Sequence, residues 1–265
     1  MNKHSYLKKV YPITDRFPDI PEEGTLYVAD SSLLRSAESE CRRLFIPTGF
    51  PFVIYRNIHS SDEGFFENVK FVLEGDGEFD PEDFDDDFLE NIYRRLHKIP
   101  WDIAETDRCI LRETCLSDLD SFYEIYSDPE ITEFTEDLME RSEEEKYTEN
   151  YRDLIYEIYG HGIWTVVLKC SGEIIGRAGL DERAGYNTPE LGFVIGKKWQ
   201  KKGYATEVCR EILRWAHDNN ISEVMSLTEK ENISSVKLLE KLGFSLKDSV
   251  NTGTQSLLRY VKNTN

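Results

Sequence analysis

The sequence predicts an α/β protein with two parts: a small N-terminal α/β domain, and a C-terminal domain with a mixed, largely antiparallel central sheet flanked by helices. Strand and helix patterns alternate through residues 25–98, which is typical of an α/β layer. Further along, residues 163–169, 173–180 and 190–196 follow one another as a meander of strands. Pro100 separates the two patterns because proline cannot continue the preceding helix. We place the domains at 1–106 and 107–265.

Composition excludes several classes of function. The 265 residues include 51 acidic and 32 basic side chains, a formal net charge of −19. Binding to nucleic acid or to an anionic membrane is disfavoured, since both require clustered lysine and arginine. No apolar run reaches the roughly 18 residues of a membrane-spanning helix, and the N-terminus has no apolar signal segment. We therefore expect a cytoplasmic protein.

The cysteines predict neither disulfides nor a metal site. Their number is odd, no pair has a CxxC spacing, and no histidine lies close enough to complete a zinc-ligand pattern. We expect free thiols in a reducing compartment and no bound metal. The five cysteines are Cys41, Cys109, Cys115, Cys170 and Cys209.

The N-terminal part reads as alternating strands and helices. Apolar segments rich in β-formers predict strands at 25–29, 51–55 and 69–73. Helical spacing of apolar residues predicts helices at 33–45 and 83–98. The alternation favours parallel strands.

Two acidic features of this part suggest a site, but the pattern supports neither. Asp30, between a strand and a helix, faintly resembles the nucleophile of haloacid-dehalogenase-like phosphatases, yet Ser32 stands where that family has its second aspartate. We interpret Asp30 as a helix N-cap. The acidic segment 74–90 does not place a glycine at the turn and a terminal glutamate at the spacing that a calcium loop requires, so we predict a solvated loop.

The C-terminal part begins with a predicted strand at 108–112. Residues 116–118 cap a helix that 128–130 closes, and a charged helix follows at 142–159. After the meander, the sequence predicts a helix at 204–219, a strand at 223–227 and a helix from 232 that ends at Gly243.

The segment between the third meander strand and the next helix is the most informative. It contains a glycine, Gly203, which lets the backbone approach a ligand closely. Backbone N–H groups in such a loop, with the helix N-terminus behind them, form a cradle for a diphosphate. A strand, a glycine loop and a helix in this order are common, so the loop alone is a weak signal.

Two motifs strengthen the interpretation of this loop as a diphosphate-binding site. Gln200, Gly203 and Ala205 match the Gln/Arg-x-x-Gly-x-Gly/Ala signature of the GNAT N-acetyltransferases. Downstream, Asn232 and Ser235 open a helix that ends in Glu-Lys-Leu-Gly-Phe at 240–244, which resembles the second signature of that family. The resemblance runs from residue 108 to the C-terminus. Residues 128–130 and the strand start at 190–193 are most similar to the branch that includes ribosomal-protein N-terminal alanine acetyltransferases.

The resemblance implies a site for acetyl-CoA as co-substrate. The pantetheine arm would lie along strand 190–196 and contact Ser235, and a strand N–H, that of Val194 in our prediction, would polarise the thioester carbonyl. Asn232, the second predicted catalytic residue, would contact the cofactor or an ordered water near the sulfur. The diphosphate would bind the loop, where Lys201 and Lys202 either add charge or are simply solvated. The predicted cofactor-binding residues are Phe193, Val194, Ile195, Gln200, Lys201, Lys202, Gly203, Tyr204, Ala205, Thr206, Asn232 and Ser235.

An amine acceptor arrives protonated and must lose a proton before attack. We predict Glu190, at the start of the cofactor-facing strand, as the catalytic base, although a surface carboxylate is an equal interpretation. Asp181 and Glu182 are the alternates, and Tyr186 is a candidate gate. Leu239 occupies a position where many relatives have a tyrosine as general acid, so no general acid is predicted.

Together these features predict an acetyl-CoA-dependent N-acetyltransferase that moves an acetyl group to a primary amine by direct attack in a ternary complex. The acceptor is a small molecule or a protein N-terminus, and the acidity favours a cationic one. The alternative is a catalytically weak or inactive GNAT fold that binds acyl-CoA as a sensor and acts through the N-terminal domain. That domain carries no motif of a second enzyme.

Overall fold

The computed structural model describes residues 5–13, 18, 20–31, 51–59, 70–251 and 256–264. The chain divides into two compact units, Met1–Pro100 and Trp101–Asn265, which we describe separately. The division lies a few residues before the predicted boundary at 106, because β5 (Asp102–Glu105) pairs with β6 (Cys109–Arg112) in the sheet of the second unit. No described helix is long and apolar enough to cross a membrane.

The first unit contains a four-stranded parallel sheet in the order β1-β2-β3-β4. The strands are β1 (Lys9–Ile13), β2 (Thr25–Asp30), β3 (Val53–Asn57) and β4 (Val72–Gly75). The last three correspond to predicted strands. The sequence did not indicate β1, which lies at the edge, carries Pro12 and is largely exposed, so it lacks the apolar pattern of an inner strand.

Helix α3 (Asp86–His97) packs on this sheet and forms its core with Leu89, Ile92 and Tyr93. It begins later than predicted because Asp85 is its N-cap, accepting hydrogen bonds from two N–H groups of the first turn. Residues 81–83 form a separate short 3₁₀ turn, η1 (Pro81–Asp83). The predicted helix at 33–45 and Cys41 lie outside the described residues, whereas Asp30, the predicted cap of that helix, is the last residue of β2.

The acidic segment 74–90 is not a solvated loop throughout, because Glu90 belongs to α3 and is buried. Its carboxylate accepts hydrogen bonds from the Ser5 hydroxyl, the Tyr6 and Leu7 N–H groups, and Arg94 Nε at 2.8 Å. This buried carboxylate therefore attaches the N-terminal segment to the helix.

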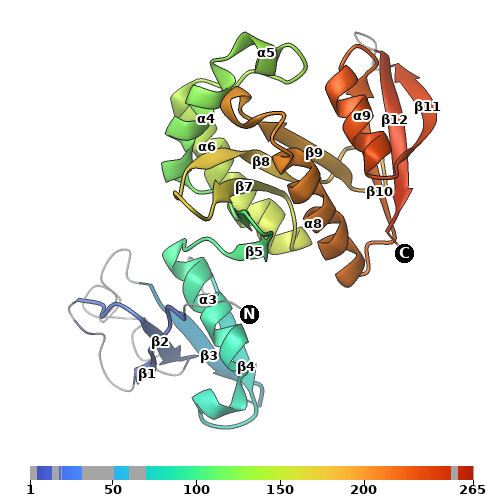
Figure 1. Ribbon diagram of the computed structural model, residues 1–265. Helices are drawn as coiled ribbons and strands as arrows, with labels where there is room; N and C mark the ends of the chain where they lie inside the picture. Colours follow the sequence, from blue (N-terminus) through green and yellow to red (C-terminus); the bar gives the residue numbers. More distant parts are fainter. Residues whose placement is uncertain are drawn as a thin grey trace. The chain divides into compact units, whose positions relative to one another are not determined.

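The second unit has an eight-stranded sheet in the order β11-β12-β10-β9-β8-β7-β6-β5. Every neighbouring pair is antiparallel except β9 and β10, which are parallel. This arrangement confirms the predicted mixed, largely antiparallel sheet (Figure 1). Besides β5 and β6, the strands are β7 (Ile163–Leu168), β8 (Ile174–Asp181), β9 (Glu190–Ile195), β10 (Glu223–Glu229), β11 (Ser245–Asn251) and β12 (Ser256–Asn263).

Helices flank both faces of this sheet. Ala178 and Leu180 of β8 enter the large core that α8 (Tyr204–Asp218) completes, whereas Arg177, next to Ala178, reaches Tyr126 of α4 (Leu119–Tyr126). Because successive strand residues face opposite sides, α4 and α8 lie on opposite faces. The remaining helical elements are η2 (Leu116–Asp118), α5 (Pro129–Thr132), α6 (Arg141–Tyr151), η3 (Arg152–Tyr156), α7 (Glu157–Tyr159), η4 (Lys197–Trp199) and α9 (Ile233–Lys241).

Two helical predictions are refined by the structure. Asp128 is the N-cap of α5 and accepts from Glu130 N–H, so residues 128–130 open a new turn as well as following α4. The predicted helix at 142–159 contains a π-helical segment, η3, between α6 and α7. A π-helical turn changes which side chains face the sheet, and such turns are frequent at functional sites.

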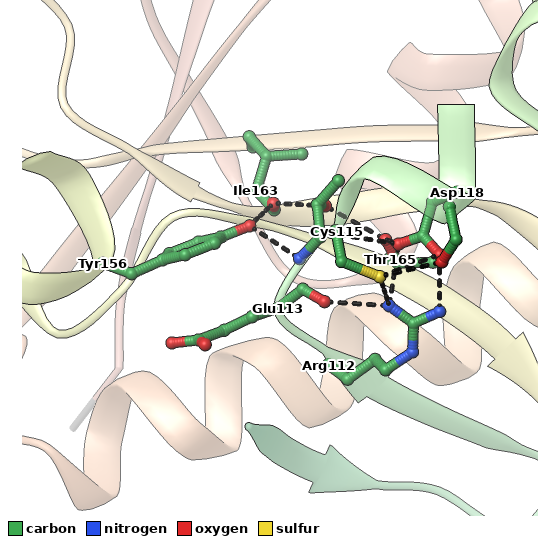
Figure 2. Close-up of polar contacts among 9 residues, drawn as sticks. Arg112, Glu113, Cys115, Asp118, Tyr156, Ile163 and Thr165 are labelled. Atoms are coloured by element: carbon green, nitrogen blue, oxygen red, sulfur yellow. Dashed lines mark hydrogen bonds and ion pairs between the residues drawn. The ribbon is translucent and has the colours of Figure 1, made fainter. Parts of the chain in front are cut away.

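A buried polar network fixes the start of this helical layer (Figure 2). Asp118, 1% exposed, accepts two hydrogen bonds of 2.7 Å from the Arg112 guanidinium, one from Cys115 N–H and one from the Thr165 hydroxyl. The Tyr156 hydroxyl donates to Ile163 O and accepts from Thr114 N–H. The network therefore ties the end of β6, the turn η2, strand β7 and the π-helical segment together.

Gly162 gives two tyrosines room beside β7. A Cβ atom at this position would lie 2.7 Å from Tyr156 Cε1 and 2.9 Å from the Tyr151 hydroxyl. Tyr151 and Tyr156 contact each other edge to face with centroids 5.2 Å apart. Only glycine at 162 therefore leaves both rings where they are.

Replacing Asp118 by asparagine is expected to destabilise the second unit by about 3 kcal/mol, because it leaves the Arg112 charge without its buried partner. Burial opposes the charged carboxylate, but the hydrogen bond and charge of Arg112 outweigh it and hold the pKa of Asp118 below its ordinary value. The stabilisation is therefore present above the ordinary aspartate pKa of about 3.9 and is lost as pH falls through the lower, folded-state pKa. Urea unfolding of wild type and D118N across the acid range measures it. The control is D248N, which breaks an exposed pair with Arg259; equal losses in both variants would contradict the role of burial.

Gly162→Ala is expected to cost about 2–3 kcal/mol of unfolding free energy, because two hydrogen-bonded rings must move. Its neighbour Gly160 has a φ of +70°, and a Cβ added there would meet no atom within 4 Å. Gly160→Ala is therefore expected to cost only the roughly 1–2 kcal/mol of a left-handed backbone. Thermal and urea unfolding compare the two variants. A Gly162→Ala protein no less stable than Gly160→Ala would show that the rings shift freely.

Candidate active site

Strands β9 and β10 separate soon after they meet, and this separation opens the sheet. They pair only at Glu190 and Met225, where Met225 N–H donates to Pro189 O at 3.0 Å. One residue further, a side chain replaces the backbone bond: the Ser226 hydroxyl donates to Leu191 O. Beyond this point β9 continues without β10 beside it, which leaves backbone groups of β9 available for a ligand.

The alternation of the strand shows which groups these are. Gly196 N–H donates to Ile175 O of β8, whereas Leu191 O accepts from β10. Since successive peptide groups point to opposite sides, the groups of Gly192 and Val194 face β8 and that of Phe193 faces the gap. The geometry therefore favours the N–H of Phe193 over that of Val194 as a donor to a bound carbonyl.

Ile195 offers neither its side chain nor its carbonyl oxygen to a ligand in the gap. Its side chain is buried in the core, and its carbonyl accepts a hydrogen bond of 2.9 Å from Gln200 Nε2. Gln200, the first residue of the predicted signature, therefore attaches the loop to the end of β9 through this hydrogen bond.

The loop between η4 and α8 has the shape of an anion cradle. Lys201 and Gly203 both have left-handed φ values, 59° and 86°, and Gly203 is the N-cap of α8. Tyr204, Ala205 and Thr206 form the first helical turn, whose N–H groups point out of the helix end. Turns of this kind and helix N-termini attract anions, so the residues present fit a diphosphate.

The lysines around the loop divide into two kinds. Lys197 pairs with Glu130, and Lys198 with Glu173 at 3.1 Å. Lys201 and Lys202 are exposed, and among the described residues neither has a carboxylate partner. The two lysines inside the signature are therefore the ones with charge available for a phosphate.

The second motif places its polar residues at the start of α9. Asn232 is the N-cap, with its Oδ1 accepting from Ser235 N–H at 3.1 Å. This bond uses only Oδ1 of Asn232 and does not involve its side-chain NH₂ group. Both residues line the cavity described next. Leu239 is fully buried in the core, so its position offers no proton donor.

A cavity of about 830 Å³ extends from the gap between β9 and β10 to the helices α4–α6. Phe193 and Val194 line one end together with Asn232 and Ser235. Seven carboxylates line the cavity against two arginines, Arg177 and Arg183. The carboxylates belong to Glu133, Glu136, Asp137, Glu144, Asp181, Glu190 and Glu229.

Glu190 lines this cavity, but both of its oxygens have partners. Oε1 accepts from Leu227 N–H at 3.2 Å, and Oε2 lies 2.8 Å from Arg183 Nη1. The carboxylate thus bridges the start of β9 to β10, just where the strands part. This arrangement suits a residue that holds the gap in shape.

Asp181 lies opposite Glu190 on β8 and has a different environment. Among the described residues its side chain has one polar partner, the Tyr151 hydroxyl, at 2.8 Å from Oδ1. Tyr151 in turn accepts from Ile163 N–H, which fixes its orientation. Asp181 is therefore a carboxylate in the cavity wall with no cation paired to it in the described chain.

The tyrosines of this wall stay protonated. Burial, reinforced by the charge of Asp181, raises the pKa of Tyr151 well above its ordinary value and raises that of Tyr147. Their hydroxyls are therefore hydrogen-bond donors at neutral pH. No sequence signal pointed to either residue, since the helical pattern of 142–159 does not show where the π-helical segment turns them.

Two predicted residues lie elsewhere. Glu182 is not part of the cavity wall, and its carboxylate lies 3.3 Å from His161 Nε2. Tyr186 is also outside the wall, with its ring beside the Arg259 guanidinium at 5.5 Å. Within the described part of the chain, no group of three or more His, Cys, Asp or Glu side chains is arranged to hold a metal ion.

Comparison with known proteins agrees with this geometry. Among curated proteins, YjdG of Bacillus subtilis (strain 168), named an uncharacterized N-acetyltransferase, is 35% identical over 89 residues, covering 33% of this chain and 53% of YjdG. The chain thus spans about half of that relative's length. The uncharacterized N-acetyltransferase p20 of Bacillus licheniformis is 28% identical over 145 residues, covering 52% of this chain and 80% of p20.

A solved structure shows the same fold. The ribosomal-protein-S5-alanine acetyltransferase from Vibrio fischeri superposes with a TM-score of 0.53 at 15% identity, covering 60% of this chain and 95% of that one. A family model described as an acetyltransferase (GNAT) domain matches residues 108–245, more than half of the 265 residues. These matches confirm the resemblance first carried by Gln200, Gly203 and Ala205, and the chain belongs to the GNAT acetyltransferases.

Proposed function

We propose that this acetyltransferase moves the acetyl group of acetyl-CoA to the primary amine of a cationic acceptor, by direct attack within a ternary complex. One observation carries the proposal. A single cavity joins the open edge of β9 to a wall of tyrosines and carboxylates that includes Asp181, which has no cation paired to it among the described residues. Both reactants therefore have a place in the same space, at opposite ends.

The donor end is supported by the loop and the gap. The diphosphate of acetyl-CoA, the donor that the family generally uses, would bind the N–H groups of residues 201–206, with Lys201 and Lys202 adding charge. The pantetheine arm would follow β9, with Asn232 and Ser235 beside it. The N–H of Phe193 would donate to the thioester oxygen and stabilise the negative charge that develops on it during attack.

The acceptor end is supported by its charge. Arg183 is paired with Glu190, and Arg177 bonds to the Tyr126 hydroxyl, so the two arginines of the wall are engaged and the carboxylates exceed them. A cavity with one sign of charge concentrates ligands of the other sign. A primary ammonium, on a small polyamine or at a protein N-terminus, fits this chemistry. The structurally similar Vibrio fischeri protein is named for an alanine of a ribosomal protein.

Proton removal can use Asp181 in this arrangement. The ammonium of the acceptor must lose a proton before its nitrogen attacks the thioester carbon. Asp181, oriented by Tyr151 and without a paired cation among the described residues, is better placed to accept that proton, directly or through a water, than Glu190 with both oxygens bonded. We therefore propose Asp181 as the base and Glu190 as the residue that links β9 to β10 at the point where the two strands part.

The leaving thiolate needs no assigned acid. Leu239 is buried, so no side chain at that position reaches the sulfur. A thiol has a pKa near 8.5, which makes its thiolate a stable leaving group at neutral pH. Collapse of the tetrahedral intermediate then breaks the carbon–sulfur bond and leaves the acetyl group on nitrogen, and the nitrogen gives up its remaining extra proton to the thiolate or to solvent.

We also propose that the protein acts in the cytoplasm and that residues 1–106 form an accessory domain. The support for the cytoplasm is the odd number and scattered spacing of the cysteines, which is typical of a reducing compartment. Burial raises the pKa of Cys109 to about 11, so that thiol stays unreactive.

The proposed function is tested by release of free CoA thiol from acetyl-CoA. The acceptors are a series of monoamines, diamines and polyamines, and peptides with free or blocked N-termini. Transfer is expected to favour acceptors with a second positive charge and to weaken as salt rises. Binding of CoA without transfer to any amine would instead support the sensor alternative.

Asp181→Asn is expected to lower kcat about 100-fold, because the residue that accepts the proton is lost while its shape is kept. Glu190→Gln retains an oxygen for Leu227 N–H and is expected to lower kcat less than about tenfold, whereas Glu190→Ala removes that contact and weakens donor binding. Steady-state kinetics against pH measures all three. A Glu190→Gln loss equal to that of Asp181→Asn would return the role of base to Glu190.

A further inference from the structure

We propose that Arg108 is a positioning residue that holds the diphosphate-binding loop in its binding shape. This inference rests on the proposed function, because it concerns the site for the donor. Arg108 immediately precedes β6, far from the loop in sequence, and no motif of the chain points to it.

The contacts of Arg108 reach three parts of the loop and helix. Its Nη1 donates to Lys202 O at 3.1 Å, and its guanidinium carbon lies 4.1 Å from the centre of the Tyr204 ring. Its Nε and Nη2 lie 2.7 and 2.6 Å from Glu207 Oε2, and its backbone N–H donates to Glu207 Oε1. One side chain thus contacts the loop, the first residue of α8 and the end of the first turn.

The bond to Lys202 O sets the direction of the next N–H group. In a trans peptide, the C=O and the following N–H point in opposite directions. Arg108 holds the carbonyl of Lys202 on its own side, so the N–H of Gly203 points the other way. The left-handed φ of Lys201 and Gly203 belongs to the same loop shape. A bound anion needs that N–H to face it rather than a carbonyl oxygen.

The ion pair removes an unfavourable charge. Glu207 lies in the first turn of α8, where its carboxylate would repel a bound diphosphate. Arg108 neutralises it. Three of the five guanidinium N–H groups, one on each nitrogen, already have protein partners, and these contacts hold the side chain against the loop. Arg108 would therefore act on the donor by holding the loop.

The experiment compares a donor that has the diphosphate with one that lacks it. Values of kcat/KM are measured for acetyl-CoA and for acetyl-pantetheine in wild type and Arg108→Met. The variant is expected to lose about three- to tenfold with acetyl-CoA, a modest loss because the contacts are partly exposed. Acetyl-pantetheine, which cannot use the loop, is expected to react equally well with both proteins.

Two further variants separate positioning from general damage. Arg108→Lys keeps the charge beside Glu207 but not the fork of donors, and an intermediate loss is expected. Arg214→Met is the matched control, because Arg214 is an exposed arginine that pairs with Glu211 on α8, the helix that also carries Glu207. No change is expected with either donor.

Calorimetric measurement of the affinity for CoA tests the role of Arg108 independently of acetyl transfer. If wild type binds CoA but transfers no acetyl group, the proposed reaction fails, while about three- to tenfold weaker binding of CoA by Arg108→Met still supports the role of Arg108. Equal losses with both donors in Arg108→Met, or no loss with acetyl-CoA, would overturn it. A wild-type protein that does not bind CoA overturns both proposals.

Discussion

The parting of β9 and β10 is the constraint on which the active site depends. A continuous sheet would use every backbone group of β9, and no ligand could bind along it. Here the two strands share one pair, at Glu190 and Met225, and side chains then replace the ladder. Ser226 and the Glu190 carboxylate satisfy the groups nearest the branch, so the open groups begin only at Phe193. The open edge of β9 therefore forms because its hydrogen bonds to β10 end early, while side chains bond the backbone groups nearest that point.

The loop at 200–206 and the cavity wall around Asp181 carry opposite charge. The loop at 200–206 carries the two lysines without carboxylate partners in the described chain, whereas the wall around Asp181 carries an excess of carboxylates. The negative charge behind the formal net value of −19 is therefore unevenly distributed between the loop and the cavity wall. The proposed polyanionic donor and cationic acceptor would each be attracted to one of these regions, which would keep the two reactants from competing for the same place.

Sequence patterns predicted the elements that bury a regular face, and the motifs located the donor loop. The apolar spacing of 204–219 and the alternation of 163–196 are of this kind. Strands β1 and β11 escaped prediction because they are mostly exposed. Glu190 and Asp181 were named from the sequence as candidate bases, but the sequence could not rank them, because their environments depend on pairings that no local pattern shows: Glu190 with Arg183 and Leu227, and Asp181 with a tyrosine that precedes a π-helical turn. Helical spacing does not reveal such a turn.

The acidic wall has a consequence for the end of the reaction. An acceptor that enters as an ammonium ion leaves as an amide, which carries no charge at neutral pH. The proposed attraction between Asp181, its neighbours and that ammonium group would therefore be lost at the acetylated nitrogen. The same carboxylates that gather the acceptor would thus release it once it is acetylated, and product inhibition by the acetylated amine would be weak.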